Sequence, residues 1–169
     1  MVVRQSDRLL VGVLALLLGV AGVTVPLRAE GEAGASIERT ERVNTMLELA
    51  NAQRAKAGLQ PLRANSRLMD AAQTQADQTA AARVLKHVLP DAKYPRPEDR
   101  LDASGYPWRA WAENIAFGQK TPSDAVEAWM QSPGHRKNLL DPKYTELGTG
   151  VAIDGTGRPY YVQVFGRPL

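Results

Sequence analysis

The stretch from 121 to 131 constrains the fold of this chain most, because it predicts a helix with a fixed start and one buried side. Thr121 can cap the helix, and Pro122 suits its first position. Three large apolar side chains then recur at helical spacing: Val126, Trp129 and Met130. Such a stripe faces a core, so we expect Trp129 to be buried between this helix and a sheet.

The next three residues, Ser132-Pro-Gly134, are expected to end this helix. Proline cannot continue it, and glycine permits a sharp turn. The turn presents His135, one of only two histidines in the chain. Arg136–Leu140 is expected to form a further helical turn. A forced turn that carries a rare titratable side chain predicts a functional position.

Sequence patterns predict three further helices and three strands. The helices cover 38–56, from a cap at Asn65 to about Val84, and from Pro97 to just before Gly105; the strands cover 112–118, 147–153 and 159–165. The last two strands are joined by Asp154–Gly157, and we expect both glycines of that turn to supply positive φ angles. Helices and antiparallel strands mixed in this way predict an α+β domain with helix, sheet and helix layers.

The beginning of the chain has the pattern of an export signal. Arg4 and Arg8 precede an apolar run from Leu9 to Val25 that holds no charged residue. We therefore expect residues 1–29 to be a secretory signal peptide, with an uncleaved membrane anchor as the alternative. Residues 30–36 are small, charged and rich in glycine, which predicts a linker, so the domain is expected over 37–169. These features predict a secreted or extracytoplasmic protein of the cell envelope.

Composition and missing motifs exclude several functions. The chain has no cysteine, so disulfides, thiol catalysis and cysteine metal sites are ruled out. Three of its 21 basic residues lie in the first 29 positions, and the remainder is close to neutral, which argues against a nucleic-acid binder. Neither a Gly-x-Ser-x-Gly elbow nor a His-Glu-x-x-His helix is present. We expect no organic cofactor.

Four short motifs, in order along the chain, resemble those of the CAP superfamily. They are Asn51–Leu62, Ala112–Ala116, Ala128–His135 and Tyr144–Gly150. The superfamily comprises cysteine-rich secretory proteins, antigen 5 and plant pathogenesis-related protein 1, and this chain is most similar to the bacterial exported branch. The resemblance covers about 43–165. It implies a three-layer α-β-α sandwich with an antiparallel central sheet and a cleft that holds two histidines and two acids.

The resemblance assigns the site residue by residue. His87 matches the first histidine, Glu113 the acid after Ala112, and His135 the second histidine. On local grounds alone His87 is a surface residue of a loop and Glu113 a solvated strand end. The position of the fourth member, three residues after the helix tryptophan, holds Ser132. Glu146 is our preferred substitute and Glu127 the alternative.

Such a site supports three interpretations. Two imidazoles and a carboxylate can hold Zn or another divalent cation, which favours a binding module that also takes a lipid or another small extracellular ligand. The first alternative is a metal-dependent or His/Glu hydrolase, for which a Ser132–His135 pair is a further variant. The second alternative is a protein-interaction module with a vestigial cleft. We favour the binding module over an enzyme, and the sequence leaves enzymatic activity open. The membrane is expected to be contacted only through the N-terminal segment, if that segment is uncleaved.

Overall fold

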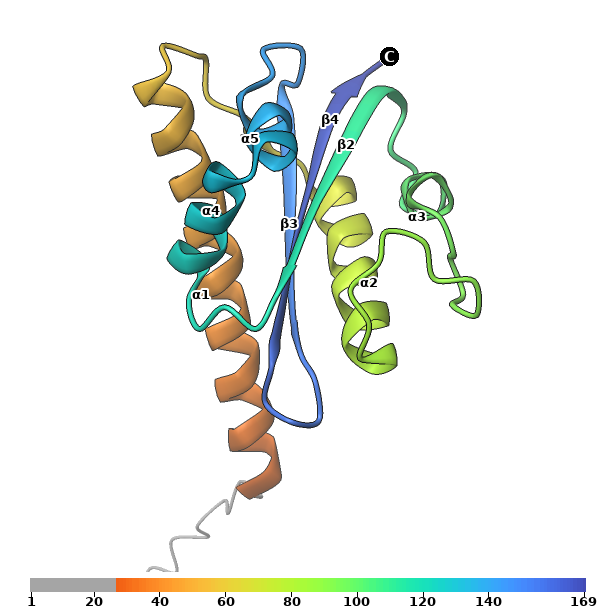
Figure 1. Ribbon diagram of the computed structural model, residues 1–169. Helices are drawn as coiled ribbons and strands as arrows, with labels where there is room; N and C mark the ends of the chain where they lie inside the picture. The colour runs from red at the N-terminus through yellow and green to blue at the C-terminus, as the bar shows by residue number, and fades with distance from the viewer. Residues whose placement is uncertain (1–26) are drawn as a thin grey trace, which may run out of the picture.

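A computed structural model describes residues 27–169, and the predicted signal peptide or anchor lies almost wholly outside them. In this part of the chain, helices surround one twisted sheet (Figure 1). The sheet has the strand order β1-β3-β4-β2, with β1 Arg63–Ala64, β2 Trp108–Phe117, β3 Glu146–Ile153 and β4 Pro159–Pro168. Strand β1 runs parallel to β3, and the other pairs are antiparallel. Strand β2 is therefore an edge of the sheet.

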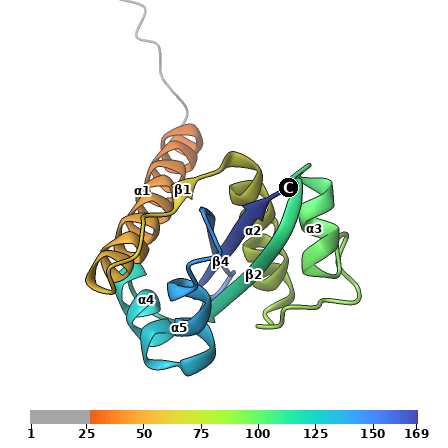
Figure 2. The ribbon, with the colours of Figure 1, turned by 90° about the horizontal axis from the view of Figure 1, so that it is seen from above.

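Helices cover both faces of this sheet (Figure 2). One layer consists of α1 Leu27–Lys56, α4 Pro122–Gln131 and α5 Pro133–Leu140, and the other of α2 Ser66–Ala82 and α3 Pro97–Ala103. The predicted α+β class and its three-layer α-β-α sandwich are confirmed. No helix between residues 27 and 169 is long and apolar enough to cross a membrane.

A hydrophobic core fills each interface between sheet and helices. On the α1 side, Trp129 is 1% exposed, as its stripe predicted, and its Nε1 donates to the Ile115 carbonyl at 3.2 Å. On the α2 side, helix and sheet approach very closely. A Cβ at Gly148 would overlap the Leu68 backbone, and one at Gly150 would overlap that of Ala72. Glycine on β3 thus lets the alanine-rich face of α2 lie directly on the sheet.

Two local expectations were wrong. Helix α1 begins at Leu27 and so includes residues 30–36, which we expected to be a linker; alanine and glutamate there are good helix formers. In the β3–β4 turn only Gly157 has a positive φ, +84°. The Asp154 carboxylate shapes this turn instead, because it accepts hydrogen bonds from Thr156 and from the Arg158 backbone N–H.

Candidate functional site

Two consecutive polar residues of β2 organise the site. Glu113 and Asn114 lie in the middle of this strand, because β2 begins at Trp108, and both are buried. The expectation of a solvated strand end for Glu113 was therefore wrong. Successive side chains of a strand point to opposite faces. Glu113 reaches into the α2–α3 layer, and Asn114 reaches into the layer of α1, α4 and α5.

The Glu113 carboxylate is held by two partners in its layer. Arg100 of α3 donates from one Nη to both oxygens, at 3.0 and 3.3 Å. His87 places its Nδ1 2.8 Å from Oε1. The side chains of Arg100 and Glu113 are only 1% and 2% exposed, so this ion pair is fully buried. Both carboxylate oxygens are thus occupied from within the protein.

Arg100 also shapes the loop that carries His87. Its guanidinium donates to the backbone carbonyls of His87, Tyr94 and Pro95 at 3.1 to 3.4 Å. One buried side chain therefore fixes both the carboxylate and the backbone of the histidine beside it. Sequence reasoning missed Arg100, because an arginine in a short helix next to an acidic run has the pattern of a solvated surface residue.

His87 follows the end of α2, where Arg83 adopts a left-handed φ of +53° and stops the helix. Its side chain is 50% exposed, in contrast to its buried partner Glu113. An ionised carboxylate only accepts hydrogen bonds, so Nδ1 of His87 must donate to it. The neutral ring then has a free acceptor at Nε2, which is the nitrogen available to a ligand.

His135 lies in the first turn of α5, and not in a turn between helices. Ser132 is extended, with φ −94° and ψ 118°, and separates α4 from α5. Pro133 then begins the new helix, and Gly134 does not use a positive φ. Our expectation of a glycine turn was wrong because proline favours the first position of a helix as strongly as it ends one. Nδ1 of His135 lies 2.9 Å from Ser132 Oγ.

Asn114 fastens α5 to the sheet. Its Nδ2 donates to the His135 carbonyl at 3.2 Å, and its Oδ1 accepts from Asn138 at 3.0 Å. Gln163 of β4 lies beside it, with Oε1 3.4 Å from the same Nδ2. The helix that carries His135 is therefore held by Asn114 of β2, whereas the ring of His87 contacts the neighbouring residue of that strand, Glu113.

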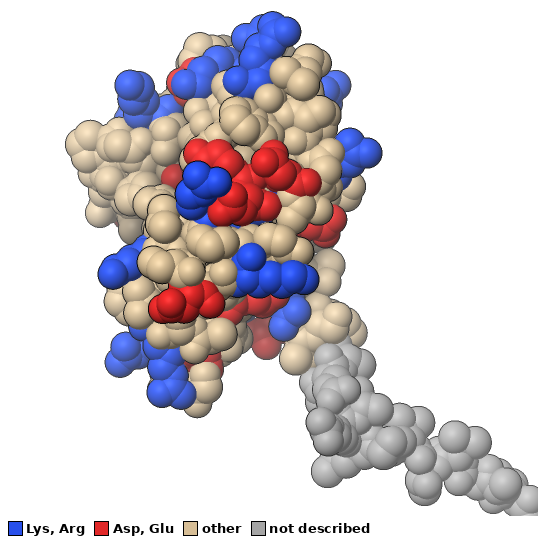
Figure 3. Space-filling view, turned by 90° about the vertical axis from the view of Figure 1, so that its right-hand side faces the viewer, with Lys and Arg blue, Asp and Glu red and all other residues tan. Residues whose placement is uncertain are grey.

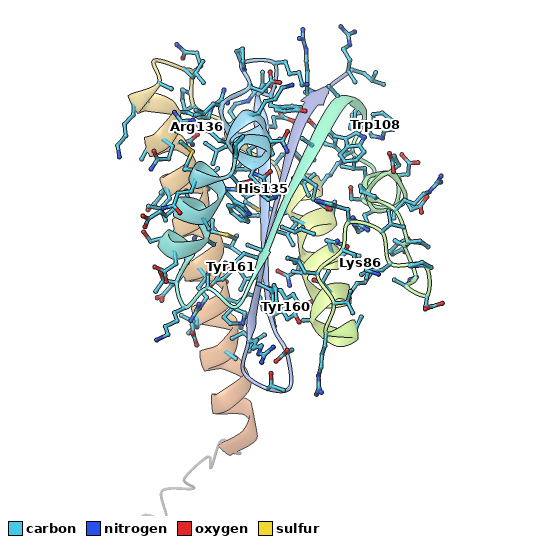
Figure 4. All side chains as sticks on the ribbon, in the orientation of Figure 1. Lys86, Trp108, His135, Arg136, Tyr160 and Tyr161 are labelled. Carbon is cyan, nitrogen blue, oxygen red and sulfur yellow. The ribbon has the colours of Figure 1, made fainter. Side chains whose placement is uncertain are left out.

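The environment of His135 favours the uncharged form of its imidazole. Burial lowers the pKa of His135 below its ordinary value, and the charge of His87 lowers it further. The two histidines come from opposite layers of the fold, His87 from the loop after α2 and His135 from α5. His135 projects between α5 and β2 in Figure 4, and the labelled Lys86 marks the loop of His87 across the strand. At neutral pH the depressed pKa keeps His135 uncharged, which is the form that binds metals.

The two acids considered for the fourth position, Glu146 and Glu127, have other partners than the histidines. Glu146 instead accepts hydrogen bonds from Arg63, Asn65 and Tyr106 at 2.8 to 3.1 Å. Glu127 is exposed and accepts from Gln131 on its own helix. Residues 27–169 contain no group of three or more His, Cys, Asp or Glu side chains arranged to hold a metal ion. Of the acids considered for the site, Glu113 is the one that contacts a histidine, His87.

An open pocket of ≈ 470 Å³ lies against the loop of His87. Most of its lining is apolar, and it is formed by the end of α2 and the loop that follows: Gln78, Ala81, Ala82, Val84, Lys86, Leu89, Pro90, Asp91 and Ala92. The pocket shares this loop with the histidine site, although His87 itself does not line it.

Comparison with known sequences identifies the family. The sequence model described as "CAP: Cysteine-rich secretory protein family" matches residues 47–165. The uncharacterized protein YkwD of Bacillus subtilis is 39% identical over 111 residues, which are 66% of this chain and 42% of YkwD. The uncharacterized membrane protein YlbC of the same organism is 33% identical over 135 residues, 77% of this chain and 37% of YlbC. The chain thus spans about two fifths of these relatives.

Solved structures share the fold. An extracellular protein of Bacillus anthracis that contains an SCP domain superposes with a TM-score of 0.70 at 27% identity, covering 76% of this chain and 41% of that one. An outer surface protein of Borrelia burgdorferi has a TM-score of 0.68 at 21% identity, over 75% of this chain and 92% of that one. The arrangement of helices and sheet is therefore shared beyond clear sequence similarity.

Proposed function

Because this chain belongs to the CAP family of cysteine-rich secretory proteins, we propose that it is an extracytoplasmic binding module whose two histidines hold a divalent metal ion. The observation that carries the proposal is the engagement of both rings through Nδ1. His87 uses that atom toward Glu113, and His135 uses it toward Ser132. Each ring therefore keeps Nε2 for an external partner. Imidazole nitrogens suit Zn, Cu and Ni better than Ca or Mg.

Glu113 supports this site as an orienting group and not as a ligand. A carboxylate that accepts from the Nδ1–H of a metal-binding histidine fixes the ring and its tautomer. Arg100 also donates to both oxygens of Glu113, which holds the carboxylate between α3 and His87. Two protein nitrogens predict weak binding, because zinc sites in proteins have three or four protein ligands.

A small apolar molecule is a second candidate ligand, supported by the pocket of ≈ 470 Å³ beside the loop of His87. Ligand pockets are typically apolar clefts of this size with a few polar groups at the rim, and here Lys86 and Asp91 supply those groups. A lipid chain fits this chemistry. Mass spectrometry of the solvent extract of the purified protein is expected to find a bound lipid, and Ala81→Trp, which fills the pocket, is expected to remove it.

The hydrolase alternative has less support. Ser132 and His135 do form a contact of 2.9 Å, but a catalytic base of this type needs an acid on its other nitrogen. Glu113, the buried acid of the site, contacts His87 instead. An extracytoplasmic location is supported by the apolar run from Leu9 to Val25 and by the extracellular relative of Bacillus anthracis.

Calorimetry with ZnCl₂ at pH 7 tests the proposed metal site. We expect one site in the unmodified chain and none in His87→Ala or His135→Ala, with Glu127→Gln as a control that removes an exposed acid outside the site. Binding is expected to weaken as pH falls below the ordinary histidine pKa of about 6.5, because protons compete for the same nitrogens. If both alanine variants bind Zn as tightly as the unmodified chain, the shared site does not exist.

A further inference from the structure

The outer edge of β2 carries backbone groups that no other strand uses. Strand β2 is an edge of the sheet, and Figure 2 shows β4 on its inner side. In an antiparallel pair, successive residues alternate between bonding to the neighbouring strand and pointing away from it. Directly after β2, the Gly118 N–H donates to the Pro159 carbonyl at 2.8 Å. The register therefore gives the outward orientation to the alternate residues Trp111, Glu113, Ile115 and Phe117.

Side-chain contacts along β2 agree with this orientation. The Trp111 carbonyl accepts from the Tyr144 hydroxyl at 2.9 Å, and the Ile115 carbonyl accepts from Trp129 Nε1 at 3.2 Å. Within residues 27–169, the N–H groups of Glu113 and Ile115 and the carbonyl of Glu113 have no hydrogen-bond partner. The middle of the edge thus presents a donor, an acceptor and a second donor in a row.

Little water reaches these unpartnered groups. Glu113 is 6% exposed as a whole residue but only 2% exposed in its side chain, so solvent reaches mainly its main chain. Ile115 is 7% exposed. Backbone donors and acceptors that are shielded from water are costly to leave unpaired. A molecule that supplies the missing partners would therefore be favoured at this edge.

The edge lacks the features that usually protect an outer strand from pairing with another chain. Such strands commonly carry proline, lysine or a bulge. Residues 111–117 contain neither proline nor lysine, and the register irregularity of β2 lies before them, between Trp108 and Ala110. The one charged side chain in this stretch, Glu113, is paired with Arg100 inside the protein. The neighbouring face of the molecule carries charges of both signs (Figure 3), so its charge does not select the ligand.

We propose that the outer edge of β2 binds an extended segment of another polypeptide, which adds a fifth strand to the sheet. An extended chain repeats its outward N–H and C=O groups every two residues, about 6.8 Å, which is also the repeat of β2. It therefore matches the whole row of unpartnered groups, whereas a lipid or a sugar offers no such repeat. Addition of a strand to a sheet edge is a common mode of peptide recognition. This inference does not depend on the proposed metal site.

The added strand lies between the two histidines. Side chains at opposed positions of paired strands share a face, so the ligand residue opposite Glu113 points to the side of His87, and its neighbours point to the side of His135. Figure 4 shows His135 on one side of β2 and Lys86, next to His87 in the chain, on the other. A second copy of the protein would bring its own α5 and loop against these, which favours a single strand as the occupant.

Amide hydrogen exchange, followed by NMR on the full chain in a mild detergent with EDTA, tests the proposal without any metal. The probe is a short capped peptide of alternating Thr and Val with a Lys at each end. At millimolar peptide, we expect the amides of Glu113 and Ile115 to exchange several-fold more slowly, because each gains a hydrogen-bond acceptor. Unchanged exchange at both amides would overturn the proposal. Slow exchange that depends on protein concentration without peptide would assign the edge to a second copy and would also overturn it.

N-methylated forms of the same peptide provide the matched control. A strand uses the N–H groups of alternate residues for each of its edges, so methyl groups on every second residue block one edge and leave the other. We expect this form to bind and a form methylated on both edges to fail. In the protein, Phe117→Pro removes an outward N–H of β2, which an edge strand tolerates, whereas Phe117→Ala removes the same ring and keeps the N–H. Only the proline variant is expected to bind the peptide more weakly. Equal binding of the peptide methylated on both edges would refute backbone pairing.

Discussion

Arg100 holds the buried half of the site together, and its removal has a predictable cost. Arg100→Met keeps most of the side-chain volume and deletes the charge. The Glu113 carboxylate, 2% exposed, is then left without its counter-ion. Removing one partner of a buried pair typically costs about 3–5 kcal/mol, because the remaining charge is desolvated and unpaired. Three loop carbonyls also lose their donor, which makes the upper part of this range the better estimate.

Urea unfolding at pH 7, followed by tryptophan fluorescence, measures this loss. We expect the double variant Arg100→Met/Glu113→Gln to recover much of it, since no buried charge remains. Arg96→Met is the control beside the same helix: its pair with Asp99 is as short, 2.9 Å, but the Arg96 side chain is 65% exposed, so no measurable change is expected. A loss under about 1 kcal/mol in Arg100→Met would mean that water screens the pair, and the argument from burial would be refuted.

Three further predictions follow from burial, titration and close packing. Trp129→Ala is expected to lower the free energy of unfolding by about 3–5 kcal/mol in urea titrations; a loss under about 1 kcal/mol would place the ring outside the core. The folded pKa of His135 is depressed, so the unfolded chain binds the proton more readily, and the stability of the metal-free protein should fall as pH drops below about 6.5. His135→Asn should flatten that part of the melting-temperature curve, and an unchanged curve would assign the pH dependence elsewhere. Gly148→Ala should lower the melting temperature strongly, because its Cβ overlaps the Leu68 backbone, whereas Gly134→Ala, with open space around it, should not; similar melting of both variants would contradict the close approach of α2.

The parts of the fold that could be predicted are those determined by neighbouring residues in the sequence, such as helix caps and the spacing of apolar side chains. The caps at Asn65 and Thr121 begin their helices as expected, since each side chain accepts hydrogen bonds from the first turn. Trp129 is buried because helical spacing alone determines which residues share a stripe. Strand β1 was not predicted, because its two residues are defined only by pairing with β3, far away in the chain.

The histidines and Glu113 could be named from their motifs, but their partners could not. The resemblance identified three site residues and left the fourth acid open. Glu146 was preferred for its place before a strand, yet its partners are Arg63, Asn65 and Tyr106. Arg100 was missed because burial of a charged side chain depends on the loop folded over it, which no local pattern records. The metal site itself stays a prediction.

Two neighbouring residues of β2 contact opposite helix layers. This arrangement affects states of the protein in which one helix layer has detached from the sheet. The ion pair of Glu113 with Arg100 forms only while α3 is packed against the sheet. The hydrogen bond from Asn114 to the His135 carbonyl forms only while α5 is packed there. A ligand that requires both histidines can bind only when neither layer has detached. It would therefore slow hydrogen exchange in α3 and α5 together, even if these helices open independently in the free protein.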